Sequence, residues 1–191
     1  MRRQQPAHGG FDPGKVTANG TEEKDINLEI AKKLESKLKE NGITVLMTRE
    51  DDSGLYDEDS SNKKAEDMKS RVDLINETKP VLAVSIHQNS YTDASVKGAQ
   101  VFYYTHSDTS KKIAEDMQEL LREVDTGNTR QAKADSTYYM LKKTEVPTVI
   151  IECGFLTNAV DAAKLQEEAY QQDMADIICE GIIASLSELE E

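Results

Sequence analysis

The chain has 191 residues, which is most simply a single domain (residues 1–191) long enough to bury a core. Its 36 acidic and 23 basic residues give a formal net charge of −13, which repels phosphate backbones and excludes nucleic acid as an expected partner. No apolar run approaches the roughly 18 residues of a membrane span, and residues 1–6 lack the apolar stretch of a signal peptide.

The chain opens on a loop built around a histidine. His8 is followed directly by Gly9 and Gly10, and Pro13 and Gly14 come soon after. Glycines allow the backbone to approach closely and leave an imidazole free to project, which a metal site requires. A plain surface turn explains the same composition, so this segment alone does not decide between the two.

A helix is expected next, with Thr21 as its N-cap. Glu23 falls in its first turn, where the helix dipole favours an acidic residue even without a functional role. The buried face of this helix carries an apolar residue at every fourth position: Ile26, Ile30, Leu34 and Leu38. Asn41 and Gly42, which tolerate a left-handed backbone, are expected to end it.

The next segments alternate between strand and helix. Residues 43–48 predict a strand that finishes at Arg49. Residues 50–62 are rich in Asp, Ser and Gly without a period, so we expect a long loop that could rim a substrate groove. A helix is predicted over residues 63–76, and Pro80 stops it before the following strand.

Two apolar strands each deliver a reactive side chain. Residues 81–86 form an uninterrupted apolar run ending at His87, and residues 147–151 form another ending at Glu152. In open α/β sheets, functional groups gather at the carboxyl ends of the strands. Taken singly, His87 is equally well a loop histidine and Glu152 a solvated strand end. Because the two lie at equivalent strand ends, the pair favours a functional site.

The remaining pattern completes an α/β fold. Residues 98–104 predict a strand, Asp108 is expected to cap a helix, residues 126–136 look irregular, and residues 137–143 predict a short helical turn. Asn158 is expected to cap another short helix, before an amphipathic helix that closes the chain. Cys153 and Cys179 are expected to be buried free thiols. We therefore predict an α/β three-layer sandwich, with a mixed, largely parallel sheet and helices on both faces.

The small number of histidines restricts any zinc site. The chain has three, His8, His87 and His106, and the polar surroundings of His106 indicate that it is exposed to solvent. Two histidines and a carboxylate, with one position left for water, are a common ligand set of catalytic zinc. Spacing alone does not identify the carboxylate among 36 acidic residues.

Five motifs together carry a resemblance to a known family. In chain order they are His8-Gly9-Gly10, Glu23-Lys24-Asp25 before a Leu/Ile helix, Thr48-Arg49, Ser85-Ile86-His87-Gln88-Asn89, and Ile151-Glu152-Cys153-Gly154-Phe155-Leu156-Thr157-Asn158. This set resembles the zinc-dependent N-acetylmuramoyl-L-alanine amidases, in the amidase type 3 catalytic domain, over nearly the whole chain. Within the family, the chain is similar to the compact wall-lytic amidases of spore-forming bacteria.

The resemblance implies a mechanism and its residues. His8, Glu23 and His87 would hold Zn²⁺, and Glu152 would be the catalytic carboxylate. The bond cut would be the amide between the lactyl group of N-acetylmuramic acid and the L-alanine of the stem peptide in peptidoglycan. Zinc activates water and polarises the carbonyl, and a glutamate that is not a ligand can move the proton. Asn89 and Arg71 would serve the site or the packing around it.

The chain departs from the family pattern at its start. Family members carry an apolar strand before the histidine loop, whereas here only Met1, two arginines and two glutamines precede Pro6. We therefore expect the first strand to be missing or truncated, with His8 loosely held. A missing strand would expose backbone groups along a groove, which favours self-association through that edge.

The substrate sets further expectations. Peptidoglycan lies outside the cytoplasmic membrane, so an extracytoplasmic location is expected, although this sequence shows no export signal. The acidic charge gives no attraction to an anionic wall, so an activator protein is a candidate partner. The damaged start also leaves open a catalytically impaired peptidoglycan-binding module, and a zinc hydrolase acting on another amide is a third alternative.

Overall fold

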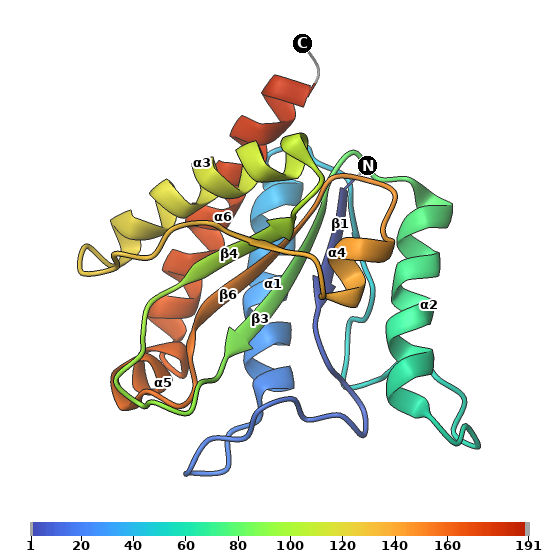
Figure 1. Ribbon diagram of the computed structural model, residues 1–191, viewed down its shortest axis with the longest axis horizontal. Coiled ribbons are helices and arrows are strands. Elements are labelled where there is room, and N and C mark those ends of the chain that lie inside the picture. The colour runs from blue at the N-terminus through green and yellow to red at the C-terminus, as the bar shows by residue number, and fades with distance from the viewer. Residues whose placement is uncertain (1, 190–191) are drawn as a thin grey trace.

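A single six-stranded sheet forms the centre of the molecule, which a computed structural model describes over residues 2–189 (Figure 1). Its strand order is β2-β1-β3-β6-β4-β5. The strands are β1 (Arg2–Pro6), β2 (Val45–Met47), β3 (Ala83–Asn89), β4 (Gln100–Tyr104), β5 (Lys133–Asp135) and β6 (Thr148–Phe155). Neighbours run parallel except β4 and β6, which are antiparallel, so the predicted mixed, largely parallel sheet is confirmed.

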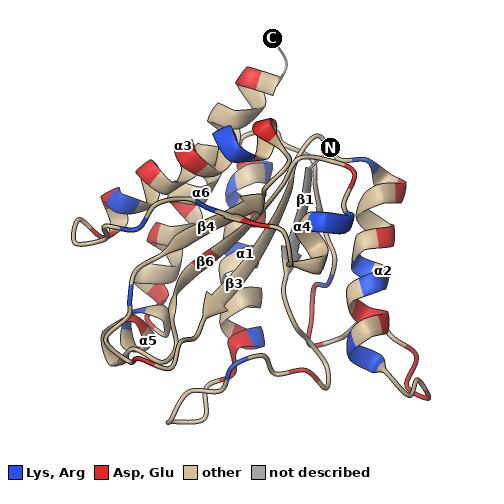
Figure 2. Cartoon of the chain, viewed as in Figure 1, with Lys and Arg blue, Asp and Glu red and all other residues tan. Residues whose placement is uncertain are grey.

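Helices cover both faces of this sheet, as predicted (Figure 1). They are α1 (Glu23–Glu40), α2 (Lys63–Thr78), α3 (Asp108–Val124), α4 (Tyr139–Lys143), α5 (Ala159–Leu165) and α6 (Glu168–Leu189). Apolar residues of α1, α3 and α6 pack on one face, and those of α2 and α4 pack on the other. Charged residues lie mainly on the helices and loops (Figure 2). Within residues 2–189, no helix combines the length and apolarity that crossing a bilayer would require.

Strand alternation decides on which face the candidate residues lie. Ile86 and Ile151 point into the core beneath α1, α3 and α6, whereas Ile150 packs against α2 and α4. Successive side chains of a strand point to opposite faces. His87 and Glu152 therefore face the α2 and α4 side, at the carboxyl ends of two adjacent parallel strands.

The expectation of a missing first strand is wrong. The backbone of β1 pairs with β2 on one side and with β3 on the other, in registers that include Arg2 with Val45 and Arg3 with Ala83. Pro6, which has no N–H to donate, stands at the strand's last position. Backbone hydrogen bonds to both neighbouring strands hold this segment in the sheet, although its sequence lacks an apolar run. Since β1 lies between β2 and β3, no missing strand exposes backbone groups there, and the reason given for edge-mediated self-association no longer holds.

Helix starts and one short strand differ from the prediction in detail. α1 begins after Glu22, which makes no side-chain cap, so Thr21 is not its N-cap. α3 is capped by the hydroxyl of Ser107, one residue before the expected Asp108. Asn158 caps α5 as predicted, and both cysteines are buried and free. Strand β5 lies within the stretch expected to be irregular, because three residues carry too little pattern to be recognised.

Candidate metal centre and active site

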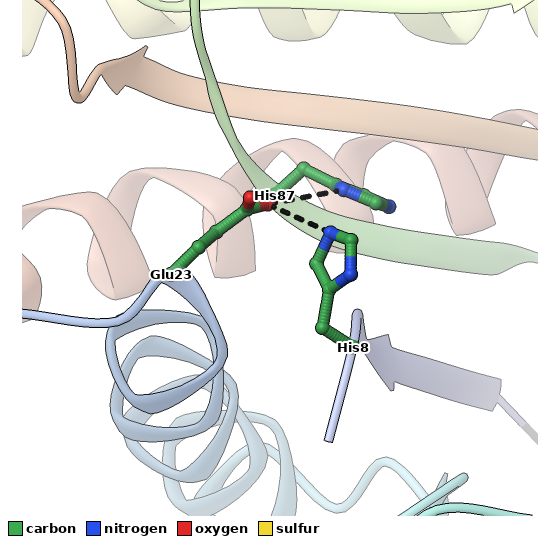
Figure 3. Close-up of side chains that lie close together, drawn as sticks. All are labelled: His8, Glu23 and His87. Carbon is green, nitrogen blue, oxygen red and sulfur yellow. Dashed lines mark ion pairs between the residues drawn. The ribbon is translucent and has the colours of Figure 1, made fainter. Parts of the chain in front are cut away.

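Three segments bring His8, Glu23 and His87 together (Figure 3). His8 follows β1, His87 lies near the end of β3, and Glu23 opens α1. The Glu23 Oε1 atom lies 3.2 Å from His8 Nε2 and 3.4 Å from His87 Nδ1. One ligand atom from each residue lies within 4.8 Å of the others. Two imidazole nitrogens and one carboxylate oxygen match the donor set of catalytic zinc, whereas His106 is exposed and outside this group.

The Glu23 carboxylate is fixed by backbone and side-chain donors. Its Oε2 accepts the backbone N–H of Lys15 at 2.8 Å, and its Oε1 accepts the backbone N–H of Gln88 at 3.1 Å. Asn27 adds a longer contact of 3.4 Å to Oε1. Burial acts to raise the pKa of Glu23, but hydrogen bonds from the two histidines outweigh it and hold this pKa well below its usual range. Glu23 is therefore an anion that faces both imidazoles.

His8 is oriented by a second carboxylate that the sequence did not single out. Its Nδ1 lies 2.9 Å from Asp12 Oδ2, so Nε2 turns toward Glu23. A carboxylate on the far nitrogen of a histidine ligand fixes the tautomer and ring orientation. Burial lowers the pKa of His8, but the hydrogen bonds to Asp12 and Glu23 outweigh it and raise this pKa to about 9. The available signal was an acidic residue four positions after a histidine in a glycine loop.

Two buried arginines hold the backbone that carries His8. Arg71 donates to the carbonyls of Pro6 and His8, both at 2.9 Å. Arg49 donates to the carbonyls of Pro6 at 3.2 Å and Ala7 at 3.1 Å. Arg71 is fully buried and pairs with Asp67 through two contacts of 2.6 and 3.1 Å. His8 adopts a φ of +59°, so these donors hold it in a left-handed conformation, and the expected loose attachment is not what the structure shows.

Gly14 is required where the histidine loop returns to the metal site. A Cβ atom at this position would lie 2.6 Å from Glu23 Oε2 and 2.8 Å from His8 Cδ2. Its φ of +67° also lies in the left-handed region. The loop can therefore close over both candidate ligands only with glycine here.

Glu152 lies beside this cluster but outside it. It pairs in register with His87 across β3 and β6, and only 6% of its surface is exposed. Its Oε2 has no hydrogen-bond partner among the residues that the structure describes. Burial, followed by the negative charge of Glu23, raises the pKa of Glu152 to about 8. A carboxyl group that gains and loses a proton near neutral pH is suited to general acid–base chemistry.

Comparison with known proteins agrees with this geometry. A family model described as N-acetylmuramoyl-L-alanine amidase matches residues 5–184. The chain belongs to this amidase family. It is 38% identical over 186 residues to the germination-specific N-acetylmuramoyl-L-alanine amidase of Bacillus subtilis (strain 168), covering 96% of this chain and 78% of that relative. The N-acetylmuramoyl-L-alanine amidase LytC of the same organism is 31% identical, but the match spans only 34% of its length.

Solved amidase structures share the whole fold. The CwlD amidase from Clostridioides difficile, solved in complex with the GerS lipoprotein, superposes with a TM-score of 0.94 at 38% identity, covering 97% of this chain and 98% of that one. An N-acetylmuramoyl-L-alanine amidase from Clostridium difficile 630 gives a TM-score of 0.86 at 30% identity, covering 97% and 96%. The predicted family, enzyme class and α/β fold are thereby confirmed.

Proposed function

We propose that this amidase uses Zn²⁺ held by His8, Glu23 and His87 to hydrolyse the bond between N-acetylmuramic acid and L-alanine in peptidoglycan. The observation that carries the proposal is a His/Glu/His cluster beside a buried carboxyl group that has an unpartnered oxygen. The cluster offers nitrogen and oxygen donors of the kind and number that leave catalytic zinc one position for water. Zinc, when bound, would lower the pKa of a water molecule and polarise the substrate carbonyl.

The chain's own residues supply the proton transfers. Glu152 accepts a proton from the attacking water and donates it to the leaving nitrogen, so the products are the lactyl carboxylate and the free amine of L-alanine. The raised pKa of Glu152, about 8, suits both directions of transfer. Asp12 and the donors around Glu23 hold the ligand side chains in place during this cycle.

The test separates metal binding from catalysis. We expect the parent, purified with zinc, to release stem peptide from cell walls, and Glu152→Gln to lose at least about 100-fold in rate while keeping its zinc. His87→Ala should lose both the zinc and the activity, with metal content read by mass spectrometry. Equal rates for the parent and Glu152→Gln, or zinc retained by His87→Ala, would contradict the assignment. Comparing muropeptides with plain dipeptides tests the alternative of a different amide substrate.

The reading as an impaired binding module loses its structural support. It rested on a damaged first strand, and β1 is paired on both sides. For partners, the related C. difficile amidase was solved in complex with a lipoprotein. We infer that this chain also binds a partner protein, and that the partner activates it at the wall outside the cytoplasmic membrane. Comparing wall hydrolysis with and without a candidate lipoprotein tests that inference.

A further inference from the structure

A polar cavity of about 490 Å³ lies near Glu152, and its lining runs from Asn89 at the end of β3 to Gln100 and Phe102 of β4. Gln100, which lines it, is the antiparallel register partner of Glu152 across β4 and β6. Directly opposed residues point to the same face, with Cβ atoms about 5 Å apart. Phe102, Tyr138 and Phe155 form its apolar wall. If the scissile amide of the substrate lies at Glu152, this cavity can hold the part of the substrate that continues beyond that bond.

Two basic residues, Arg130 and Lys133, and one acidic residue, Asp135, line this cavity. Neither basic residue makes an ion pair with any residue between 2 and 189. Asp135, the acidic residue on the rim, instead uses Oδ1 to accept the backbone N–H groups of Thr137 at 2.6 Å and Tyr138 at 2.8 Å. The lining therefore carries two positive charges and one negative charge, in a molecule whose net charge is −13.

The guanidinium of Arg130 is held in a fixed orientation with donors to spare. Its Nε donates to the carbonyl of Lys97 at 2.7 Å, and its Nη1 donates to Gln100 Oε1 at 3.0 Å. The group lies over the ring of Phe155, 4.5 Å from its centroid. Nη2 makes no hydrogen bond in the described part of the chain. A stacked, anchored guanidinium loses little freedom when it binds a carboxylate, which is the anion that its planar fork fits.

We propose that this cavity binds the stem peptide of the substrate, and that Arg130 is a specificity-determining residue that binds a free carboxylate one or two residues beyond L-alanine. The proposal rests on the proposed function, since it takes the scissile amide to lie at Glu152. The spacing follows from the contacts. Gln100 opposes Glu152, Arg130 touches Gln100, and an extended peptide advances about 3.3 Å per residue. Lys133, which is exposed, adds a screened attraction of the same sign.

The experiment compares an acidic stem with an amidated one. The probes are muropeptides and the corresponding free tripeptides, with carboxylates beyond L-alanine either free or converted to amides. For the parent we expect about tenfold tighter binding of the acidic tripeptide by calorimetry, and a KM about tenfold lower with similar kcat for the acidic muropeptide. Arg130→Gln should erase that preference, whereas Lys142→Gln, which neutralises an exposed charge on α4 outside the cavity, should retain it.

The outcomes separate this proposal from the function on which it rests. A parent that binds both tripeptides equally, or an Arg130→Gln variant that keeps the preference, overturns the proposal even if wall hydrolysis is normal. A parent that cleaves no wall refutes the proposed function, while the tripeptide binding still decides the role of Arg130. If Arg130→Gln fails to fold, Arg130→Lys keeps the charge without the fork, and an undiminished preference in that variant counts against carboxylate binding by the fork.

Discussion

At the scale of single residues, protons and Zn²⁺ compete for the ligand atoms of the proposed zinc site. Without metal, the pKa of His8 is raised to about 9 by Asp12 and Glu23 against the opposing effect of burial. Burial lowers the pKa of His87 too, and there it outweighs the opposing effect of Glu23, so the pKa of His87 is lowered. His8 is therefore protonated at neutral pH and His87 is neutral. Zinc can bind His8 only by displacing its proton.

Zinc binding is expected to release protons and to strengthen as pH rises. Since the pKa of His8 is about 9 and that of Glu152 about 8, both groups carry a proton at pH 7 in the metal-free protein. Zn²⁺ displaces the proton of His8 and repels the proton of Glu152. Calorimetry in buffers of different ionisation enthalpy should find between one and two protons released by the parent, and about one by Glu152→Gln. Affinity should fall steadily from pH 9 to pH 6. An affinity independent of pH in that range contradicts a ligand set containing His8.

Gly14 offers a test of how closely the loop approaches the ligands. Gly14→Ala should lower zinc affinity at least about tenfold, because the added Cβ displaces Glu23 or His8. Gly42→Ala is the matched control, since Gly42 has a similar φ of +74° but no atom within 4 Å of the added Cβ. Both substitutions should cost roughly 1–2 kcal/mol of backbone strain. Equal zinc affinities in the two variants would show that the loop relaxes freely.

At the scale of elements, the pairing of β1 decides whether His8 is placed at all. The strand ends at Pro6, and the next peptide continues the ladder through a 3.1 Å hydrogen bond from Ala7 N–H to the carbonyl of Ile86. Helix α2 reinforces this from the side through Arg71, which reaches both Pro6 and His8. The position of one ligand is thus set jointly by a strand and a helix that lie far apart in the sequence.

Removing Arg71 should therefore affect stability and metal binding together. Arg71→Met leaves Asp67 without its buried partner, and breaking such a pair typically costs about 3–5 kcal/mol of unfolding free energy. Zinc occupancy should also fall, because the carbonyl of His8 loses its donor. Lys69→Gln, which breaks an exposed pair with Asp73 on the same helix, should cost below about 0.5 kcal/mol. Denaturant unfolding and metal analysis check both; a small loss for Arg71→Met would assign it a packing role alone.

Predictability from sequence differed among the elements for physical reasons. Strands β3 and β6 were recognised because both of their faces are buried, which demands the continuous apolar runs that end at His87 and Glu152. β1 was missed because backbone pairing places it while its sequence carries no apolar signal, and β5 because three residues show no period. The contacts of Arg49 with Pro6 and Ala7, and the cavity around Arg130, join segments that are distant in the sequence, which no local pattern encodes. Glu23, the proposed carboxylate ligand, needed the family resemblance to be chosen among 36 acidic residues.

At the scale of the whole molecule, the net charge of −13 opposes binding to an anionic cell wall. Raising the ionic strength from about 0.01 to about 0.15 M shortens the screening length from roughly 30 to 8 Å and should weaken that repulsion. We therefore expect sedimentation with purified walls to increase with salt, measured on Glu152→Gln so that the wall stays intact. Binding that decreases with salt would indicate that a local positive surface governs adsorption.

The position of β1 also has a consequence for synthesis on the ribosome. Strand β1 pairs with β3, for example through Arg3 and Ala83. Strand β3 pairs in turn with β6, where Ala83 lies opposite Thr148. Contacts between residues so distant in sequence form slowly, since a long loop must close first. The sheet that positions His8, the first candidate ligand, therefore cannot be complete until translation has passed Phe155, the last residue of β6. A nascent chain stopped before β6 should remain open to proteolysis and to chaperones even when zinc is plentiful.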